Sequence, residues 1–252
     1  MFYFDDFFGK KVLKSTLLED CEHFFTTRDF PLFQGTREDL KSVADKNVDF
    51  LIEKFNINKN SLYRCKQMHT ANVEIGNGDK NFFDNTDSII LTTPNTATFL
   101  NFADCIPIIL YDSVANTGAI VHAGWRGTAS KIQQNAVKLM MQNGSKPQNI
   151  RAAIGAGIGK CCFDVNKDVF EKIFNGIDKV TAKTAYSYDE KTEKYFVDLK
   201  EVNKILLNEI SVQQIDVSGY CTSCSNDVFF SYRKENGDTA RHSAVLKINK
   251  KG

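Results

Sequence analysis

The sequence has few prolines, little net charge and no long hydrophobic run. Its 4 prolines are scattered, and no Pro-, Gly- or Ser-rich linker divides the chain, so we expect one domain spanning residues 1–252. No apolar run approaches the roughly 18 residues of a membrane-spanning helix. The net charge is +1, and no basic stripe points to nucleic acid. These absences argue against a membrane protein and against a nucleic-acid-binding protein.

The cysteine content and the N-terminal residues both indicate in which cellular compartment the protein is expected. Seven cysteines, an odd number, fit a reducing compartment better than a disulfide framework. The first residues, MFYFDDFFGKK, contain two aspartates and no small-residue cleavage site follows them, which argues against a signal peptide. We therefore expect a cytoplasmic protein. Its subunit state, monomer or homodimer, is open.

The periodicity of apolar residues predicts helices and strands that do not alternate regularly. Helices are predicted over 36–56 with Thr36 as a cap, 128–143, 166–175 and 198–209, the last with Asp198 and Glu201 at capping-box spacing. Strands are predicted over 62–68, 88–93, 97–111, 117–122, 150–158, 214–218, 227–233 and 241–248. The 20 phenylalanines predict a thick aromatic core. The pattern favours a mixed α+β (α/β) fold, with mixed sheets flanked by helices.

Three residues of metal-binding type lie at the ends of predicted strands. His69 and His122 each follow a strand-like segment, and Cys105 precedes one. Strand ends at one edge of a sheet can converge despite their separation along the chain. Two imidazoles and a thiolate suit Zn²⁺ or copper, and three protein ligands leave a coordination position open for water or substrate. The alternative is that these are three unrelated core residues.

Five segments carry a resemblance to a known family. They are CKQMHTANV (65–73), ADCIPIILYD (103–112), VHAGWRGTA (121–129), IGAGIGKCCFDV (154–165) and FFSYRKENGDTARHSAVLKI (229–248). In this order they resemble the signature blocks of the YfiH-type family. That family was long described as a laccase-like polyphenol oxidoreductase domain and is now regarded as a purine nucleoside phosphorylase with adenosine deaminase activity.

The resemblance implies a single α/β domain with a metal site. It implies that His69, Cys105 and His122 are the ligands of a zinc ion, with copper as the alternative, and form the catalytic centre. It implies purine nucleosides and phosphate as substrates. The cationic residues available for phosphate or substrate are Arg28, Arg126, Arg233 and Arg241.

Other functions remain open. Copper at the same ligands would suit a polyphenol oxidase, although 4 histidines cannot fill a three-copper cluster and a further copper site. Cys105 could instead be the nucleophile of a hydrolase or amidase in peptidoglycan editing, with His69 or His122 as base. The last alternative is a binding module that a metal stabilises without catalysis.

The remaining motifs have structural and functional interpretations. The glycines of GAGIGKCC (155–162) fit either an anion site or a tight turn, and its two cysteines favour buried thiols. CTSC (221–224) has no second C-x-x-C to complete a four-cysteine site, so we favour a structural role, with Cys221 near the substrate pocket as an alternative. His23 and His242 are expected at the surface or behind the metal ligands. Asp104 either orients a ligand histidine or caps a turn.

Overall fold

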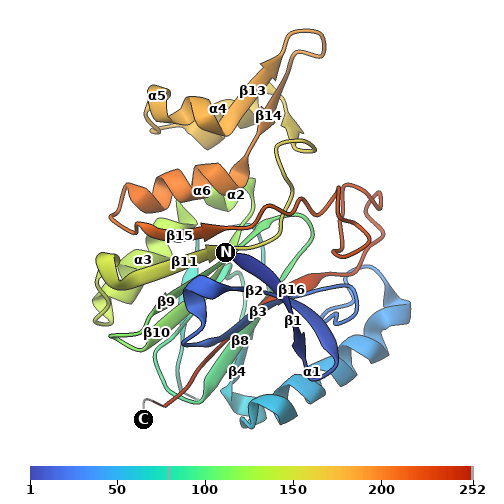
Figure 1. Ribbon diagram of the computed structural model, residues 1–252, viewed down its shortest axis with the longest axis vertical. Coiled ribbons are helices and arrows are strands. Elements are labelled where there is room, and N and C mark those ends of the chain that lie inside the picture. Colours follow the sequence, from blue (N-terminus) through green and yellow to red (C-terminus); the bar gives the residue numbers. More distant parts are fainter. Residues whose placement is uncertain (79, 251–252) are drawn as a thin grey trace.

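Two large sheets form the centre of the molecule in the computed structural model, which describes residues 1–78 and 80–250 (Figure 1). In spatial order, the first sheet consists of β1 (Phe2–Phe7), β2 (Lys10–Ser15), β3 (Glu22–Thr26), β16 (His242–Ile248), β8 (Thr96–Phe102), β4 (Leu62–Cys65) and β6 (Phe82–Phe83). The second consists of β15 (Gln214–Val217), β11 (Ile150–Ile154), β9 (Ile106–Asp112), β10 (Thr117–Ala123), β7 (Ser88–Leu91) and β5 (Val73–Gly76). Both sheets mix parallel and antiparallel pairs. The predicted mixed α+β fold is confirmed.

The apolar cores show how the layers stack. Ile109 of β9 packs with Phe25 and Phe102 of the first sheet, so these residues form the core between the two sheets. Its neighbours Ile108 and Leu110 belong to the core on the other face of the second sheet. This alternation is expected for a strand whose successive side chains point to opposite faces. Since both faces are covered, β9 is buried along its whole length.

Helices cover the two outer faces. α1 (Lys41–Phe55) packs Leu51 and Phe55 against the first sheet. α3 (Ile132–Gln142) and α6 (Leu199–Asn208) pack against the second sheet, with Met140 and Leu206 in its outer core. A short helix, α2 (Trp125–Ala129), follows β10 directly. Single 3-10 turns occupy Thr16–Leu18, Glu38–Leu40, Lys59–Ser61, Pro147–Asn149 and Lys183–Ala185.

A small third sheet lies beside α6. It consists of β12 (Asp164–Val165), β14 (Lys194–Val197) and β13 (Tyr186–Asp189), and α4 (Lys167–Phe174) and α5 (Lys179–Ala182) accompany it. Figure 1 shows the β13–β14 hairpin projecting from the top of the molecule. The rings of Phe170 and Tyr195 stack with centroids 3.9 Å apart, which fixes α4 on this sheet.

Several predicted boundaries agree with the structure. The helix predicted over 198–209 forms as α6, and the Asp198 side chain accepts hydrogen bonds from the backbone N–H groups of Lys200 and Glu201. The segments 88–93 and 241–248 contain β7 and β16, and the segment 117–122 ends one residue before β10 does. The helix predicted over 36–56 begins as a 3-10 turn and continues as α1. Thr36 does not cap it, because its hydroxyl donates to carbonyl groups of Gly237 and Thr239.

Three predictions were wrong in ways that matter for the site. The single strand predicted over 97–111 is two strands, β8 and β9, separated at 103–105, where the Ala103–Asp104 peptide bond is cis. The helix predicted over 128–143 is split into α2 and α3 by Lys131, whose φ of 58° is left-handed. The strand predicted over 227–233 is absent: Val228 and Phe229 donate to the Ser225 carbonyl in a turn, and the Ser231 N–H donates to the Glu235 carboxylate.

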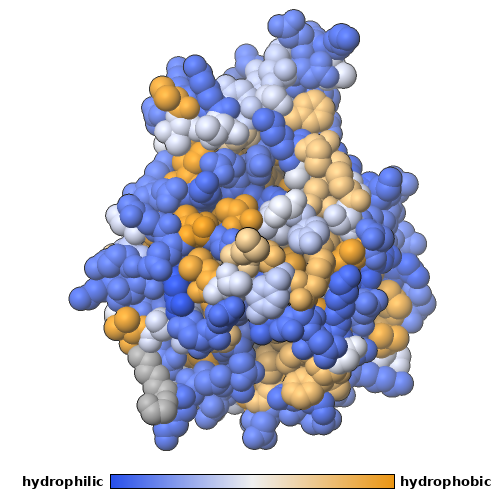
Figure 2. Space-filling model, in the orientation of Figure 1, coloured by the Kyte–Doolittle hydropathy of each residue, from blue (hydrophilic) through white to orange (hydrophobic). Residues whose placement is uncertain are grey.

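The surface is predominantly polar. Figure 2 shows polar residues over most of the face in view, with apolar residues in small groups between them. Among the described residues, no helix combines the length and the hydrophobicity needed to cross a bilayer.

Candidate metal centre and its cavity

The pairing of β9 with β10 brings Cys105 and His122 together. The strands are antiparallel, with His122 opposite Pro107 and Ala123 opposite Ile106. Cys105 precedes Ile106 and therefore lies across from Gly124. A β-carbon on Gly124 would lie 2.8 Å from the Cys105 sulfur and 3.2 Å from the His69 ring. The absence of a side chain at position 124 is thus what allows the three residues to approach one another.

His69 reaches the same place from the loop after β4. Its backbone is left-handed, with φ of 61°, and its N–H donates to the Asp87 carboxylate at 3.0 Å. The Asp87 carboxylate also accepts from the N–H groups of Met68 and Thr70 and from the Thr70 hydroxyl. Asp87 therefore fixes the turn that presents His69.

Asp87 also fixes His122. It precedes β7, which pairs with β10, and the His122 N–H donates to the Asp87 carbonyl at 2.8 Å. The His122 Nδ1 lies 2.8 Å from the Asp87 carboxylate. This contact leaves Nε2 as the nitrogen available to a metal, which is the usual arrangement of a carboxylate behind a ligand histidine. Sequence reasoning missed Asp87, since an aspartate before a strand is an ordinary turn residue.

The charges in this group are coupled. Burial acts to raise the pKa of Cys105, but the charge and hydrogen bond of His122, together with His69, outweigh it and lower the pKa to about 6. Burial acts to lower the pKa of His122, but Cys105 and Asp87 raise it to about 9. The hydrogen bonds from His122 and Thr70 hold the pKa of Asp87 well below its usual range despite burial. Cys105 is therefore favoured as a thiolate, the form that binds metals.

We call His69, Cys105 and His122 the histidine–cysteine centre. One ligand atom from each lies within 4.8 Å of the other two, and the rings of His69 and His122 have centroids 4.9 Å apart. Two nitrogens and one sulfur fit the borderline-soft Zn²⁺ ion, and three ligands match the open pattern of catalytic zinc sites. Zinc or copper fits this donor set; calcium and magnesium, which prefer oxygen ligands, do not.

The histidine–cysteine centre forms part of the wall of a cavity of about 940 Å³. The cavity is at the upper end of the size range of small-molecule sites. Aromatic side chains line it, among them Phe82, Phe99, Trp125, Phe163 and Tyr232. Cationic side chains also line it: Lys41, Arg64, Lys66, Arg126, Arg233 and Arg241. The carboxylates are only Asp45 and Asp104 among the described residues. The cavity therefore suits a ligand with a flat ring and negative charge.

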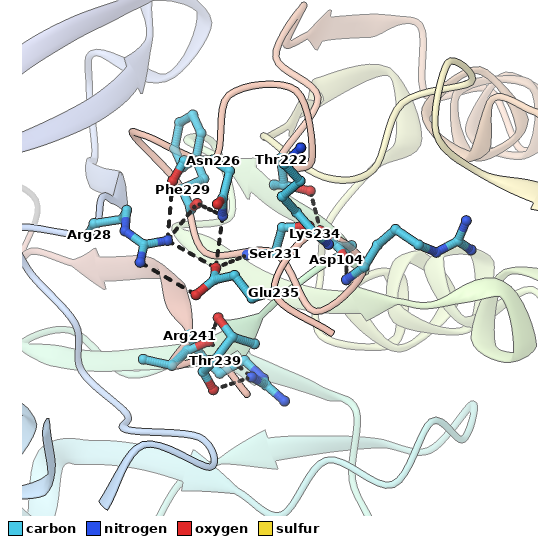
Figure 3. Close-up of polar contacts among 12 residues, drawn as sticks. Arg28, Asp104, Thr222, Asn226, Phe229, Ser231, Lys234, Glu235, Thr239 and Arg241 are labelled. Carbon is cyan, nitrogen blue, oxygen red and sulfur yellow. Dashed lines mark hydrogen bonds and ion pairs between the residues drawn. The ribbon is translucent and has the colours of Figure 1, made fainter. Parts of the chain in front are cut away.

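The four predicted arginines have different surroundings. Arg126, Arg233 and Arg241 line the cavity, whereas Arg28 does not. Figure 3 shows Arg28 turned toward Glu235, to which it donates at 2.9 Å; it also stacks on Phe230. The Arg28 guanidinium is thus engaged outside the cavity, which argues against a phosphate contact.

The three predicted arginines that line the cavity also differ in the hydrogen bonds and ion pairs that they form. Arg233 donates to Asp164 and to the Cys162 carbonyl. Arg241 donates to the carbonyl groups of Thr239 and Ala240 (Figure 3). Arg126 is exposed, lies over the Trp125 ring and has no ion pair within the described residues. Of the predicted arginines that line the cavity, Arg126 therefore has the most freedom to bind an anion.

The sequence profile described as "Multi-copper polyphenol oxidoreductase laccase" matches residues 30–249. The chain belongs to this family. Its curated relatives include the purine nucleoside phosphorylase YlmD of Bacillus subtilis, 32% identical over 243 residues, with 88% of this chain and 86% of the relative covered. The purine nucleoside phosphorylase YfiH of Escherichia coli is 30% identical over 68% of this chain and 67% of the relative. The adenosine deaminase RL5 of an unknown prokaryote is 33% identical over 60% and 58%.

Solved structures of other proteins share the fold. The YfiH protein of Bacillus licheniformis superposes with a TM-score of 0.85 and 29% identity, covering 94% of this chain and 96% of that one. YlmD of Geobacillus stearothermophilus gives 0.83 and 25%, with 98% and 99% covered. The resemblance to the YfiH-type family is therefore confirmed.

Three other predicted residues have different roles in this laccase-family chain. Asp104 does not orient a histidine: its carboxylate accepts from the Thr222 hydroxyl at 2.6 Å (Figure 3) and from the backbone N–H of Arg233 at 2.8 Å. His23 and His242 are not at the surface. Both are buried, and burial lowers the pKa of each to about 4. They are not part of either potential metal-binding group among the described residues.

The glycines of GAGIGKCC serve close packing. β-Carbons on Gly155 and Gly157 would collide with the Phe25 ring and the Ile106 side chain, at 2.3 and 2.6 Å. The thiols that follow were expected to be buried, but Cys161 is exposed and Cys162 is half-buried. Cys221 is buried and is not among the residues lining the cavity.

Proposed function

We propose that this chain is a zinc-dependent purine nucleoside phosphorylase that also deaminates adenosine. The observation that carries the proposal is the histidine–cysteine centre in the wall of a cavity lined by aromatic and cationic side chains. The names of the relatives YlmD, YfiH and RL5 supply the two reactions.

His69, Cys105 and His122 would hold the zinc ion, and Asp87 would keep His69 and His122 in place. When bound, zinc supplies Lewis acidity at the cavity wall and lowers the pKa of water. Asp87 reaches both histidines through separate hydrogen bonds, so it acts as a positioning residue rather than as a ligand.

In phosphorolysis, a phosphate oxygen bonds to the anomeric carbon of the ribose while the glycosidic bond breaks. The purine leaves with the bonding electrons and takes up a proton. Arg126 would bind the phosphate, assisted by Arg241, because cations stabilise its charge in a partly enclosed site. Arg64 and Lys66, which sequence reasoning did not single out, also line the cavity as further cations. Trp125 and Phe163 provide flat apolar surfaces for the purine.

In deamination, water adds to C6 of the adenine and ammonia leaves, which converts adenosine to inosine. This reaction consumes no phosphate. The cavity would thus take one nucleoside for two reactions, of which only cleavage of the glycosidic bond requires phosphate.

Product analysis tests the proposal. Purified protein is incubated with adenosine, inosine and methylthioadenosine, with and without phosphate, and the products are separated by chromatography. Adenine and hypoxanthine should form only with phosphate, together with ribose 1-phosphate, whereas inosine should form from adenosine in both conditions. Release of free base without phosphate would contradict phosphorolysis, and absence of inosine would contradict deamination.

A cysteine hydrolase is the second candidate, because the pKa of Cys105 is lowered to about 6 and His122 lies beside it. Metal removal separates the two. Loss of nucleoside turnover on chelation and its return with added Zn²⁺ supports the metal enzyme. Turnover that survives chelation but not the substitution Cys105→Ser supports the nucleophile. Restoration by Cu²⁺ but not Zn²⁺, with oxidation of a phenol, would favour the copper oxidase.

A further inference from the structure

Four cysteines meet outside the cavity. Cys161 and Cys162 follow β11, and Cys221 and Cys224 follow β15, which pairs in parallel with β11. This pairing continues into a bridge between Gly157 and Cys221, so the two segments run side by side. One sulfur atom from each cysteine lies within 4.8 Å of the other three. We call this group the four-cysteine cluster.

From this geometry we propose that the four-cysteine cluster binds one Zn²⁺ ion as a closed, structural site. Four thiolates around zinc at about 2.3 Å have sulfur–sulfur separations of about 3.8 Å. The Cys224 sulfur lies 3.5 Å from the sulfurs of both Cys161 and Cys162, close to that separation. The proposal does not rest on the proposed function, because none of these cysteines lines the cavity.

The contacts do not single out a disulfide. Cys224 is equally far from Cys161 and Cys162, whereas a disulfide would join it to one of them at about 2.05 Å. Such a bond would leave the other thiol and Cys221 without a role. A single tetrahedral ion uses all four sulfurs, and tetrahedral sulfur coordination is typical of zinc or iron.

The backbone around the four-cysteine cluster contacts the sulfur atoms closely. The Gly159 N–H donates to the Cys221 sulfur at 3.1 Å, the kind of contact that supports a metal-bound thiolate. A β-carbon on Gly159 would lie 3.3 and 3.4 Å from the sulfurs of Cys161 and Cys221. Glycine at this position lets the backbone pass closely beneath the two sulfurs, which a larger residue would push apart.

Nearby cations offset the charge. Four thiolates and one Zn²⁺ carry a net charge of −2, and the buried Lys200 lies near Cys161 and Cys221. Its ammonium donates to the carbonyl groups of Ser218 and Tyr220, just before the C-x-x-C segment. Arg233 donates to the Cys162 carbonyl. Binding forms four Zn–S bonds and releases the thiol protons to water, with no change of oxidation state.

The ion would join two segments that support Cys105. The Ile158 N–H donates to the Asp104 carbonyl, and the Thr222 hydroxyl donates to the Asp104 carboxylate. Both residues neighbour the four-cysteine cluster along the chain, and Asp104 precedes Cys105. A zinc ion here would therefore hold in place the segment that presents Cys105 to the cavity.

Zinc content of the full chain tests the proposal. Protein purified under reducing conditions should contain about two zinc ions per chain, one for each cluster. Cys161→Ser combined with Cys224→Ser should leave about one, Cys105→Ala should also leave about one, and the triple variant should leave none. Cys21→Ala is the matched control, because Cys21 is buried and belongs to neither group of ligands, and it should keep both ions.

A cobalt spectrum tests the same site without measuring the nucleoside reaction and without relying on the folding of the double serine variant. In the Cys105→Ala background, added Co²⁺ should give the strong sulfur-to-cobalt absorption of a tetrahedral four-thiolate site. Cys224→His, which retains four ligands, should still bind cobalt with a weaker sulfur band. This variant remains informative if the double serine variant does not fold.

The proposal is overturned if the Cys105→Ala protein contains no zinc and gives no such cobalt spectrum. It is equally overturned if the native protein contains iron in this site. A disulfide at Cys224, detected under non-reducing conditions as the loss of two hydrogen atoms from the mass, would also overturn it.

Discussion

The histidine–cysteine centre and the four-cysteine cluster are joined through one short segment, 103–105, yet their surroundings differ. The first has three ligand residues, a carboxylate behind two of them and a cavity in front. The second has four sulfurs, no such carboxylate contact among the described residues, and two of its cysteines exposed to solvent. An incomplete ligand set facing a cavity favours chemistry on a bound molecule, whereas a complete set between two loops favours structural support.

The largest effect should come from Cys105→Ala. Removing the only sulfur ligand of the histidine–cysteine centre should lower kcat/KM for phosphorolysis by about 1,000-fold or more, because a catalytic metal contributes several kcal/mol to the transition state. Steady-state kinetics with inosine and phosphate measure this, alongside metal content. The double variant Cys161→Ser/Cys224→Ser should lose far less activity and more thermal stability. Equal losses of activity would remove the distinction between the two clusters.

Asp87→Asn should have the next largest effect. The amide cannot supply the charge that holds His122, so zinc affinity should fall by about 10- to 100-fold. Zinc competition with a chelator measures the affinity. Asp168→Asn, which alters an exposed carboxylate on α4, is the control. If zinc affinity at the histidine–cysteine centre is unchanged in Asp87→Asn, the positioning role of Asp87 is wrong.

Arg126→Gln should raise KM for phosphate by about 10-fold, with a smaller change in kcat, because a charged hydrogen bond contributes about 1.5–3 kcal/mol. The matched variant is Arg28→Gln, since Arg28 lies outside the cavity and binds Glu235. It should destabilise the protein without a comparable increase in KM for phosphate. An increase in KM for phosphate in Arg28→Gln but not in Arg126→Gln would show that Arg28 is the phosphate contact.

The smallest effect concerns the turns after the C-x-x-C segment. Burial acts to raise the pKa of Glu235, but hydrogen bonds from Arg28, Ser231 and Asn226 lower it to about 2. The ordinary value is about 4.3, so Glu235 stabilises the folded state fully above pH 4.3 and loses this contribution as the pH falls toward 2.

Glu235→Gln should therefore cost about 1 kcal/mol at pH 7, and the cost should vanish near pH 2. Denaturant unfolding of both proteins across this pH range measures the difference. A cost that persists unchanged at low pH would show that the charge of Glu235 does not stabilise these turns.

The sequence was informative where function depends on residue type and position near a strand end. His69, Cys105 and His122 could be selected because each adjoins an apolar strand segment and each can bind a soft metal. Asp87 could not, since its role depends on the register that places β7 beside β10. That register also depends on how β9 and β10 pack between the two cores, which no local pattern encodes.

The four-cysteine cluster was missed for a similar reason. The sequence contains one C-x-x-C and one adjacent pair, which do not resemble a familiar zinc motif. Only the parallel pairing of β11 with β15 brings them together. The segment 227–233 led to the opposite error: its aromatic residues favour a strand, but backbone bonds to Ser225 and side-chain bonds to Arg28 and Glu235 hold it in turns.

Gly124 also bears on how this site can evolve. A single nucleotide change converts a glycine codon into an alanine codon, and replacing glycine by alanine is normally a mild exchange. Here the added methyl group would lie 2.8 Å from the Cys105 sulfur. Selection for the close approach of His69 and Cys105 would therefore act on a residue that has no side chain to contribute.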